Sequence, residues 1–170
     1  YRLGIPSASR FKDVLAKGSG ATRKKYLYQK AAEVLTGEIP ETYQNDHMLR
    51  GIEQEPQARA LYSFSEDVEI EEVGLAVTDD SSACASPDGL IGDKGGIEIK
   101  SVISTVHIET ILSGKMPTSH KAQIQGCLWI FERDYWDFIS YSPTVTDQPL
   151  FIQRIERDDD YIKNLSAEID

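Results

Sequence analysis

The sequence predicts an α/β domain with a central mixed β-sheet flanked by helices. Apolar residues recur at helical spacing in the first third of the chain. A hairpin signal follows, and further helical segments then stand between two pairs of strand-like segments. An order of helices, strands, helix, strands and helix is typical of such a domain. The 170 residues suffice for a hydrophobic core, so we expect one domain over residues 1–170.

Three helices are expected in the first part of the chain, over residues 9–17, 21–35 and 46–64. Ser9 is the expected N-cap of the first helix and Gly18 its end, while Gly37 closes the second. Pro56 should kink or divide the third helix, because proline removes a backbone hydrogen-bond donor.

The middle and end of the chain predict the strands and the remaining helices. Acidic and apolar residues alternate over 68–77, which has strand character. Segments 83–91 and 96–102 flank Gly92-Asp93-Lys94-Gly95, a strong signal for a hairpin turn. The other expected elements are helices over 105–113 and 119–131, strands over 135–141 and 150–156, and a last helix from about Asp158.

Charge is distributed unevenly along the chain. The net charge is −10, which argues against a polyanionic partner, yet residues 1–30 carry eight Lys and Arg against the single acid Asp13. That segment is therefore +7 and the remaining 140 residues are −17. Because salt screens charges beyond roughly 10 Å, a local basic edge could still face DNA. A solvated helix face is the alternative.

The composition excludes several classes of protein. Apolar runs such as 127–131 are too short to cross a bilayer, and residues 1–17 lack the apolar segment of a secretory signal. Two cysteines, Cys84 and Cys127, cannot form a disulfide framework or a four-thiolate metal site. We expect both to be reduced and buried, in a cytosolic protein.

Charged residues gather around the expected hairpin. Side chains two apart on a strand share a face, so Glu98 and Lys100 point together, away from the flanking isoleucines. If Asp93 and Lys94 form the loop, Gly89 lies across from Glu98, and Asp88 is the next residue along the partner strand. A register slip of one position would keep the same neighbourhood. Two carboxylates and one ammonium group should therefore converge.

Such a cluster needs further positive charge. Two carboxylates about 4 Å apart repel by roughly 1 kcal/mol in water and about 4 kcal/mol in a partly buried site. Lys100 offsets one charge, and Mg²⁺ or Mn²⁺, which prefer carboxylate oxygens, would offset the rest. A metal beside a lysine suits the activation of water against a phosphodiester. The alternative is a salt-bridged hairpin on an exposed sheet face.

Four separated segments form a wider pattern: Arg2-Leu3-Gly4-Ile5-Pro6-Ser7-Ala8-Ser9, Gly51 through Glu55 to Arg59, Ser86-Pro87-Asp88-Gly89 with Glu98-Ile99-Lys100, and Ala122-Gln123-Ile124-Gln125. In this order they resemble the bacteriophage lambda exonuclease family (YqaJ-like viral recombinases) of the PD-(D/E)XK nuclease superfamily. The pattern covers nearly the whole chain. The resemblance implies a PD-(D/E)XK, restriction-endonuclease-like core.

The resemblance also implies an activity and partners. Family members are Mg²⁺-dependent exonucleases that digest one strand of duplex DNA from 5′ to 3′ and leave a 3′ single-stranded overhang. We therefore expect two Mg²⁺ ions per site, with Mn²⁺ as a substitute, and double-stranded DNA ends as substrate. A homotrimer, a single-strand annealing recombinase as partner, and the cytoplasm of a bacterial host follow from the same resemblance. No membrane association is expected.

Individual roles are carried over by position. The resemblance implies metal binding by Asp88, Glu98, the Ile99 carbonyl and the helix acid Glu55. It implies catalysis by Lys100, and by Gln123 near the attacking water or the metal. The residues implied to contact the terminal 5′ phosphate of the DNA are Arg2, Ser9 and Ser86.

Other interpretations stay open at this point. Without the resemblance, Glu55 reads as an exposed helix acid and Gln123 as an ordinary polar helix position. His47, His107 and His120 lack ligand spacing and are interpreted as surface or hydrogen-bonded histidines. The chain could also be another PD-(D/E)XK endonuclease or a repair nuclease. A DNA-end-binding module without catalysis is the alternative from a different class.

Overall fold

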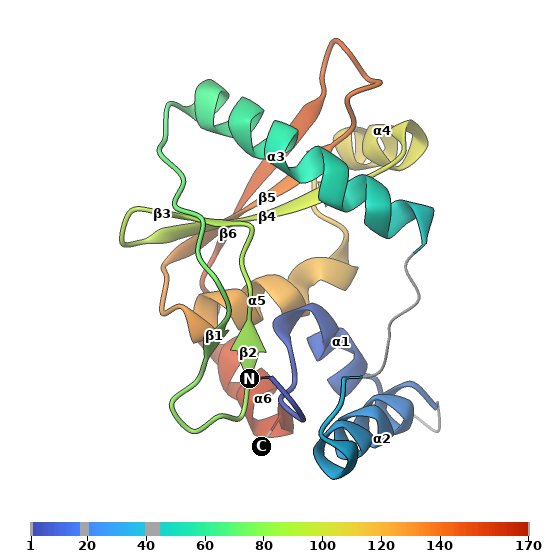
Figure 1. Cartoon of the computed structure of the whole chain (residues 1–170). Coiled ribbons are helices and arrows are strands. Elements are labelled where there is room, and N and C mark those ends of the chain that lie inside the picture. The colour runs from blue at the N-terminus through green and yellow to red at the C-terminus, as the bar shows by residue number, and fades with distance from the viewer. Residues whose placement is uncertain (1, 18–20, 40–44, 170) are drawn as a thin grey trace.

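A four-stranded mixed sheet forms the centre of the protein, in the order β3-β4-β5-β6 (Figure 1). The computed structural model describes residues 2–17, 21–39 and 45–169. The strands are β3 (Gly89–Ile91), β4 (Gly95–Ser101), β5 (Tyr135–Tyr141) and β6 (Leu150–Glu156). Strands β4 and β5 are parallel, and the outer pairs are antiparallel. The predicted α/β fold with a central mixed sheet flanked by helices is confirmed.

Helices cover both faces of this sheet. The helical elements are η1 (Ala8–Arg10), α1 (Phe11–Val14), α2 (Ala21–Thr36), α3 (Asp46–Glu66), α4 (Ser104–Ser113), η2 (Thr118–His120), α5 (Lys121–Ile130) and α6 (Asp159–Ile169). A second, two-stranded sheet pairs β1 (Ala76–Val77) with β2 (Cys84–Ala85). Helix α3 lies on one face of the central sheet and α5 on the other, with α1 and α6 packed against α5 (Figure 1).

Alternation along β4 and β5 divides the core between the two faces. On the α3 side, Ile97, Ile99 and Ile139 pack against Ala58 and Tyr62. The cluster on the α5 side includes Trp136, Phe138, Ile124 and Leu128. Gly96 is required there, because a Cβ at this position would lie 2.3 Å from the Trp136 ring. Burial of these apolar side chains, at about 25 cal/mol per Å², fixes β4 between the helices.

Several predicted elements are found as expected. Strands β5 and β6 have the predicted bounds, and α6 follows Asp158, whose Oδ1 accepts a 2.9 Å hydrogen bond from the Tyr161 N–H. Helix α2 ends at Gly37, which has a φ of +71°. Helix α3 is a single element that includes Pro56, so the predicted division is absent. Gly18 lies outside the described residues.

Three local predictions are wrong. Ser9 lies inside the turn η1 instead of capping a helix, because this turn already begins at Ala8. The strand expected over 68–77 forms only at Ala76–Val77, with an isolated bridge between Glu71 and Leu90. The strand expected over 83–91 is divided into β2 and β3 by residues 86–88.

The hairpin register differs by one position from the preferred expectation. Its turn has three residues, so Ile91 pairs with Gly95 and Gly89 lies across from Ile97 instead of Glu98. Gly92 has a φ of +50° and belongs to the turn, which shortens β3. The neighbourhood of Asp88 and Glu98 is kept, as expected for a slip of one residue.

The structure bears on two further expectations, which concern membrane-spanning helices and the cysteines. No helix in the described part of the chain is both long and apolar enough to cross a membrane. Cys84 and Cys127 are free and buried, as expected.

Candidate active site

Strand β4 presents its polar side chains toward α5. Glu98 and Lys100 lie on one face, as strand geometry predicts, and the Lys100 Nζ donates a 2.7 Å hydrogen bond to Glu98 Oε1. The Glu98 residue is only 3% exposed, and Lys100 is partly buried. The apolar packing of the opposite face by Ile97 and Ile99 holds the strand in this orientation. Core packing therefore places a buried acid and an ammonium group together.

Gln123 on α5 completes a triangle with this pair. Its Nε2 donates to Glu98 Oε1 at 2.7 Å, and its Oε1 accepts from Lys100 Nζ at 3.0 Å. Both donors reach the same oxygen of Glu98. The second oxygen, Oε2, is buried and has no hydrogen-bond partner among the residues that the structure describes. A buried carboxylate oxygen in this state is costly unless another group binds it.

Asp88 lies beside Glu98 because the chain breaks its strand pairing at residues 86–88. Its Oδ2 accepts a 2.6 Å hydrogen bond from the Ile99 N–H, which ties it to β4. Burial and the negative charge of Glu98 raise the pKa of Asp88 to about 8. The site therefore favours a proton or a cation at this carboxyl group.

Arg59 connects Glu55 to the Asp88 backbone. The Arg59 Nε donates to the Asp88 carbonyl at 2.8 Å, and its guanidinium also pairs with Glu55 and, at 2.9 Å, with Glu72. The Glu55 charge contributes to the raised pKa of Asp88. Glu55 is thus brought to the cluster, with its carboxylate engaged by Arg59. Their spacing of four residues on a helix is a signal from which the sequence could have indicated this pair.

The donor set fits a hard divalent cation. Asp88 and Glu98 supply two carboxylates, and such an ion would satisfy Glu98 Oε2, a buried atom without a partner among the described residues. Within residues 2–17, 21–39 and 45–169, no group of three or more His, Cys, Asp or Glu side chains could hold an ion. Mg²⁺ commonly binds through one or two carboxylates and keeps several waters, so two acids suffice.

The three residues expected at the DNA 5′ phosphate line two different pockets. Arg2 and Ser86 share one of about 690 Å³ with apolar neighbours. Ser9 instead lines one of about 150 Å³ together with Lys100 and Gln123. The structure brings Arg2 and Ser86 together, and it places Ser9 on the side of Lys100.

Helix α2 fixes the N-terminal segment that carries these residues. Glu33, which is 1% exposed, accepts a 3.0 Å hydrogen bond from the Gly4 N–H and pairs with Lys30 at 2.9 Å. The Tyr26 hydroxyl accepts a 3.2 Å bond from the Ser7 N–H. The sequence analysis missed Glu33 and Tyr26. Their signal is the spacing of seven residues, which places both on the buried face of α2.

The histidines differ in their surroundings. His107 is buried and contacts Ser140 Oγ at 2.8 Å and the Gln148 carbonyl at 2.9 Å, so it is hydrogen-bonded as expected. His47 is exposed, also as expected. His120 is half-buried and stacks on Phe138 at 5.3 Å between ring centroids. It lines the same small pocket as Lys100, a position that the sequence analysis did not foresee.

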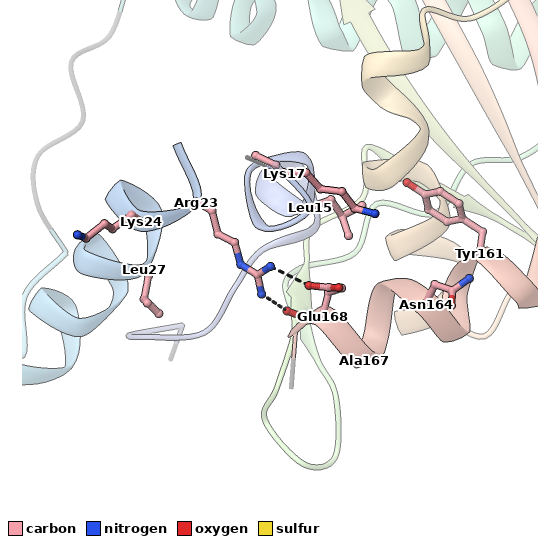
Figure 2. Close-up of a pocket in the computed structure, with 10 residues that line it drawn as sticks. Leu15, Lys17, Arg23, Lys24, Leu27, Tyr161, Asn164, Ala167 and Glu168 are labelled. Atoms are coloured by element: carbon pink, nitrogen blue, oxygen red, sulfur yellow. Dashed lines mark hydrogen bonds and ion pairs between the residues drawn. The ribbon is translucent and has the colours of Figure 1, made fainter. Parts of the chain in front are cut away.

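A larger pocket lies between α2 and α6 (Figure 2), and its lining includes neither Asp88 nor Glu98. It is lined by part of the basic N-terminal segment, including Lys17, Arg23 and Lys24. Figure 2 shows Arg23 bound to Glu168, at 2.8 Å from the carboxylate and 3.4 Å from the carbonyl oxygen. This pairing neutralises part of the basic charge, and none of the predicted site residues lines the pocket.

Comparison with known proteins gives a family and a set of similar structures. The model of the YqaJ-like viral recombinase domain matches residues 1–134. The chain is similar to LHK-Exo, an alkaline exonuclease from Laribacter hongkongensis, at 39% identity, with a TM-score of 0.89 over 99% of this chain and 85% of that one. The structure of LHK-Exo in complex with dAMP gives a TM-score of 0.91 at the same identity and the same coverage.

A more distant structure shares the fold. A phage-related exonuclease from Haemophilus somnus 129PT gives a TM-score of 0.72 at 14% identity, over 97% of this chain and 90% of that one. A search of the curated proteins finds no significant match.

Proposed function

The chain belongs to the YqaJ-like viral recombinase domain family, and on this premise we propose that it is a metal-dependent 5′-to-3′ exonuclease of double-stranded DNA. The observation that carries the proposal is the cluster of Asp88, Glu98 and Lys100, in which one buried carboxylate oxygen has no partner among the described residues. A relative at 39% identity, LHK-Exo, is called an alkaline exonuclease, and one of its structures contains dAMP. Both findings support the proposal.

Asp88 and Glu98, with the Ile99 carbonyl, would hold Mg²⁺, and Mn²⁺ would substitute for it. Glu55 would join them once its carboxylate leaves Arg59, and the site would hold two ions. When bound there, the ion would supply Lewis-acid stabilisation of the negative charge that develops on the phosphate. The raised pKa of Asp88 means that its proton must leave before an ion binds.

Lys100 and Gln123 then orient the reacting groups. The Lys100 ammonium bonds to Glu98 and Gln123, which fixes its Nζ beside the acids and uses two of its three protons. From there it can donate to the attacking water or to a phosphate oxygen. Gln123 holds Lys100 and Glu98 together, so its role in the proposal is to position both.

The DNA end would enter beside the N-terminal segment. Arg2 and Ser86 share a pocket and are the proposed contacts of the terminal 5′ phosphate, with Ser9 reaching from the Lys100 side. Arginine suits this task because its planar guanidinium binds phosphate through two parallel hydrogen bonds. The fixed contacts of Gly4 and Ser7 with α2 support a preformed end site.

The wider role follows from the family. As a single nuclease domain, the protein would leave 3′ single-stranded overhangs for a single-strand annealing recombinase in phage-type recombination. It would act as a homotrimer on DNA ends in the cytoplasm of a bacterial host.

The experiment is cleavage of linear duplex DNA labelled at the 5′ or the 3′ end, beside a covalently closed circle, in Mg²⁺ or EDTA. We expect Mg²⁺-dependent release of the 5′ label with the circle intact. A nicked or linearised circle would indicate an endonuclease instead. No cleavage with any divalent metal, together with DNA binding in EDTA, would indicate an end-binding module.

A further inference from the structure

One arginine side chain beside the acids joins three separate parts of the chain. The Arg59 side chain on α3 is 13% exposed, so its guanidinium is largely buried. Its Nε donates to the Asp88 carbonyl at 2.8 Å, and its two terminal nitrogens pair with Glu55 and, at 2.9 Å, with Glu72. Arginine suits this position because its donors are fixed in one plane, whereas the ammonium group of lysine is a single point of charge.

The bond to the Asp88 carbonyl fixes the backbone where β3 begins. Glu71 and Leu90 exchange two backbone hydrogen bonds of 2.9 Å, and this bridge is isolated. Two residues before Leu90 along the chain, the Arg59 Nε supplies the donor that the Asp88 carbonyl receives. The Ile99 N–H separately holds the Asp88 carboxylate at 2.6 Å. Arg59 therefore acts on this carboxylate through the backbone that carries it.

Glu55 and Glu72 share the guanidinium, and they differ in exposure. The Glu55 side chain is 36% exposed, whereas that of Glu72 is 71% exposed and extends from the segment before β1. If Glu55 left a guanidinium that had no second acid, a largely buried positive charge would remain without a carboxylate, which is costly. With Glu72 in place, Arg59 keeps a carboxylate partner when Glu55 leaves. Removal of Glu55 from Arg59 therefore costs less.

We propose that Arg59 positions Asp88 and holds Glu55 in reserve, and that Glu72 keeps the guanidinium paired when Glu55 turns to the metal ion. The inference rests on the proposed function, because it takes Asp88 and Glu55 as ligands of that ion. It adds a positioning role for Arg59 and gives Glu72, an acid outside the cluster, a part in metal binding. The alternative is that the three contacts of Arg59 only tie α3 to the segments around it.

The test measures the Kd of Mn²⁺ by isothermal titration calorimetry at pH 8 in the absence of DNA, so its readout is not cleavage. Glu72→Gln removes the second carboxylate from Arg59 and keeps the length of the side chain. Glu69→Gln is the matched control, because Glu69 is an exposed acid of the same segment, three residues before Glu72. Each variant loses one negative charge, so a general loss of attraction for the cation affects both.

We expect Glu72→Gln to raise the Kd about threefold relative to Glu69→Gln, an effect that matches the loss of one exposed ion pair. The reason is that Arg59, with one acid removed, holds Glu55 more firmly. In a Glu55→Gln background the two substitutions should give the same Kd, since no carboxylate is left at that position to be released.

A second variant tests the positioning of Asp88. Arg59→Lys keeps the positive charge but loses the planar fork that reaches the Asp88 carbonyl and both acids. We expect the Kd to rise about tenfold, as when a residue that orients a metal ligand is lost. The rise should persist in the Glu55→Gln background, because it acts through Asp88. Melting temperatures verify that the variants are folded, and Glu72→Gln, at an exposed position, decides the test if Arg59→Lys unfolds.

Equal Kd values for Glu72→Gln and Glu69→Gln would overturn the role of Glu72, as would a difference between them that persists in the Glu55→Gln background. A wild-type Kd in Arg59→Lys would overturn the positioning role. Each of these results leaves the metal site, and with it the proposed function, standing. A wild type that binds no Mn²⁺ would instead contradict the metal site and the inference together.

Discussion

Two neighbouring strands each bury a carboxylate, and the protein treats the two in opposite ways. On β5, Asp137 accepts two hydrogen bonds from Arg154, both 2.9 Å, and one of 2.6 Å from the Tyr62 hydroxyl. On β4, Glu98 receives both of its bonds on Oε1, and nothing in the described ranges binds Oε2. Both oxygens of the Asp137 carboxylate accept hydrogen bonds, whereas Glu98 accepts them on Oε1 and not on Oε2 in the described ranges.

The balance of charge differs in the same way. A single guanidinium offsets the charge of Asp137. Burial, followed by that carboxylate, raises the pKa of Tyr62, which stays a hydroxyl donor. Around Asp88 and Glu98, two carboxylates share the one ammonium group of Lys100. Buried charge is costly unless it is paired, so the second carboxylate on β4 needs either a proton, which Asp88 keeps up to about pH 8, or a cation from outside the chain. We infer that Asp137 serves the fold and that the β4 cluster serves a cation.

The largest expected effect is on cleavage. Asp88→Asn or Glu98→Gln should lower single-turnover cleavage in Mg²⁺ by about a thousandfold or more. A bound metal contributes several kcal/mol to the transition state, and each 1.4 kcal/mol is tenfold in rate. The melting temperature should not fall, because Asp88→Asn replaces a carboxyl group that already keeps its proton up to about pH 8, and Glu98→Gln removes the charge that repels it. A collapse in melting temperature would show that these acids serve the fold, as Asp137 does.

The second effect is on stability. Asp137→Ala should lower the free energy of unfolding by about 1–3 kcal/mol, because the buried Tyr62 hydroxyl loses its acceptor, whereas the exposed Arg154 guanidinium returns to water. Urea denaturation measures this loss. The fraction that remains folded should still cleave DNA at nearly the wild-type rate. A loss below about 1 kcal/mol would remove the distinction between the two carboxylates.

A third effect separates chemistry from binding. Lys100→Ala should slow the chemical step about a hundredfold, because a positioned donor is lost. DNA affinity, measured in EDTA, should change much less. Lys94→Ala is the control, since Lys94 lies on the exposed hairpin turn. An equal loss of rate and affinity would assign Lys100 to DNA binding alone.

The smallest effect is a dependence of stability on pH. Without metal, the folded protein keeps a proton on Asp88 up to about pH 8, whereas the unfolded chain loses it near pH 4. The folded state binds the extra proton, so stability falls as the pH rises between these values. The fall should be at least about 1 kcal/mol, since one pKa unit corresponds to about 1.4 kcal/mol.

Melting in EDTA from pH 5 to pH 9 measures this fall, and Asp88→Asn should flatten the profile. A wild-type profile that is already flat would contradict the raised pKa.

Features that depend on local geometry could be predicted from the sequence. Glu98 and Lys100 share a face because strand residues alternate, and β5 and β6 have their predicted bounds because turn residues delimit their apolar runs. The turn length was harder to predict, since it depends on the positive φ of Gly92 and moves Gly89 opposite Ile97.

Features that depend on distant contacts could not be predicted from local patterns; the family resemblance, not spacing, indicated that Gln123 lies near the site, where it contacts Glu98 and Lys100. The bond from Arg59 to the Asp88 carbonyl joins residues 29 apart, and so does that from the Gly4 N–H to Glu33. No local pattern specifies which loop meets which helix. Ser9 lines the pocket of Lys100 and not that of Arg2. This placement likewise depends on how η1 packs against α5.

Metal binding in the absence of DNA tests the central claim most directly. Isothermal titration calorimetry with Mn²⁺ at pH 8 should show saturable binding to the wild type. Asp88→Asn and Glu98→Gln should abolish it, while a variant on the other face, Tyr62→Phe, should retain it. A wild type that binds no Mn²⁺, or acid variants that bind it equally well, would contradict the assignment of the β4 cluster to a cation.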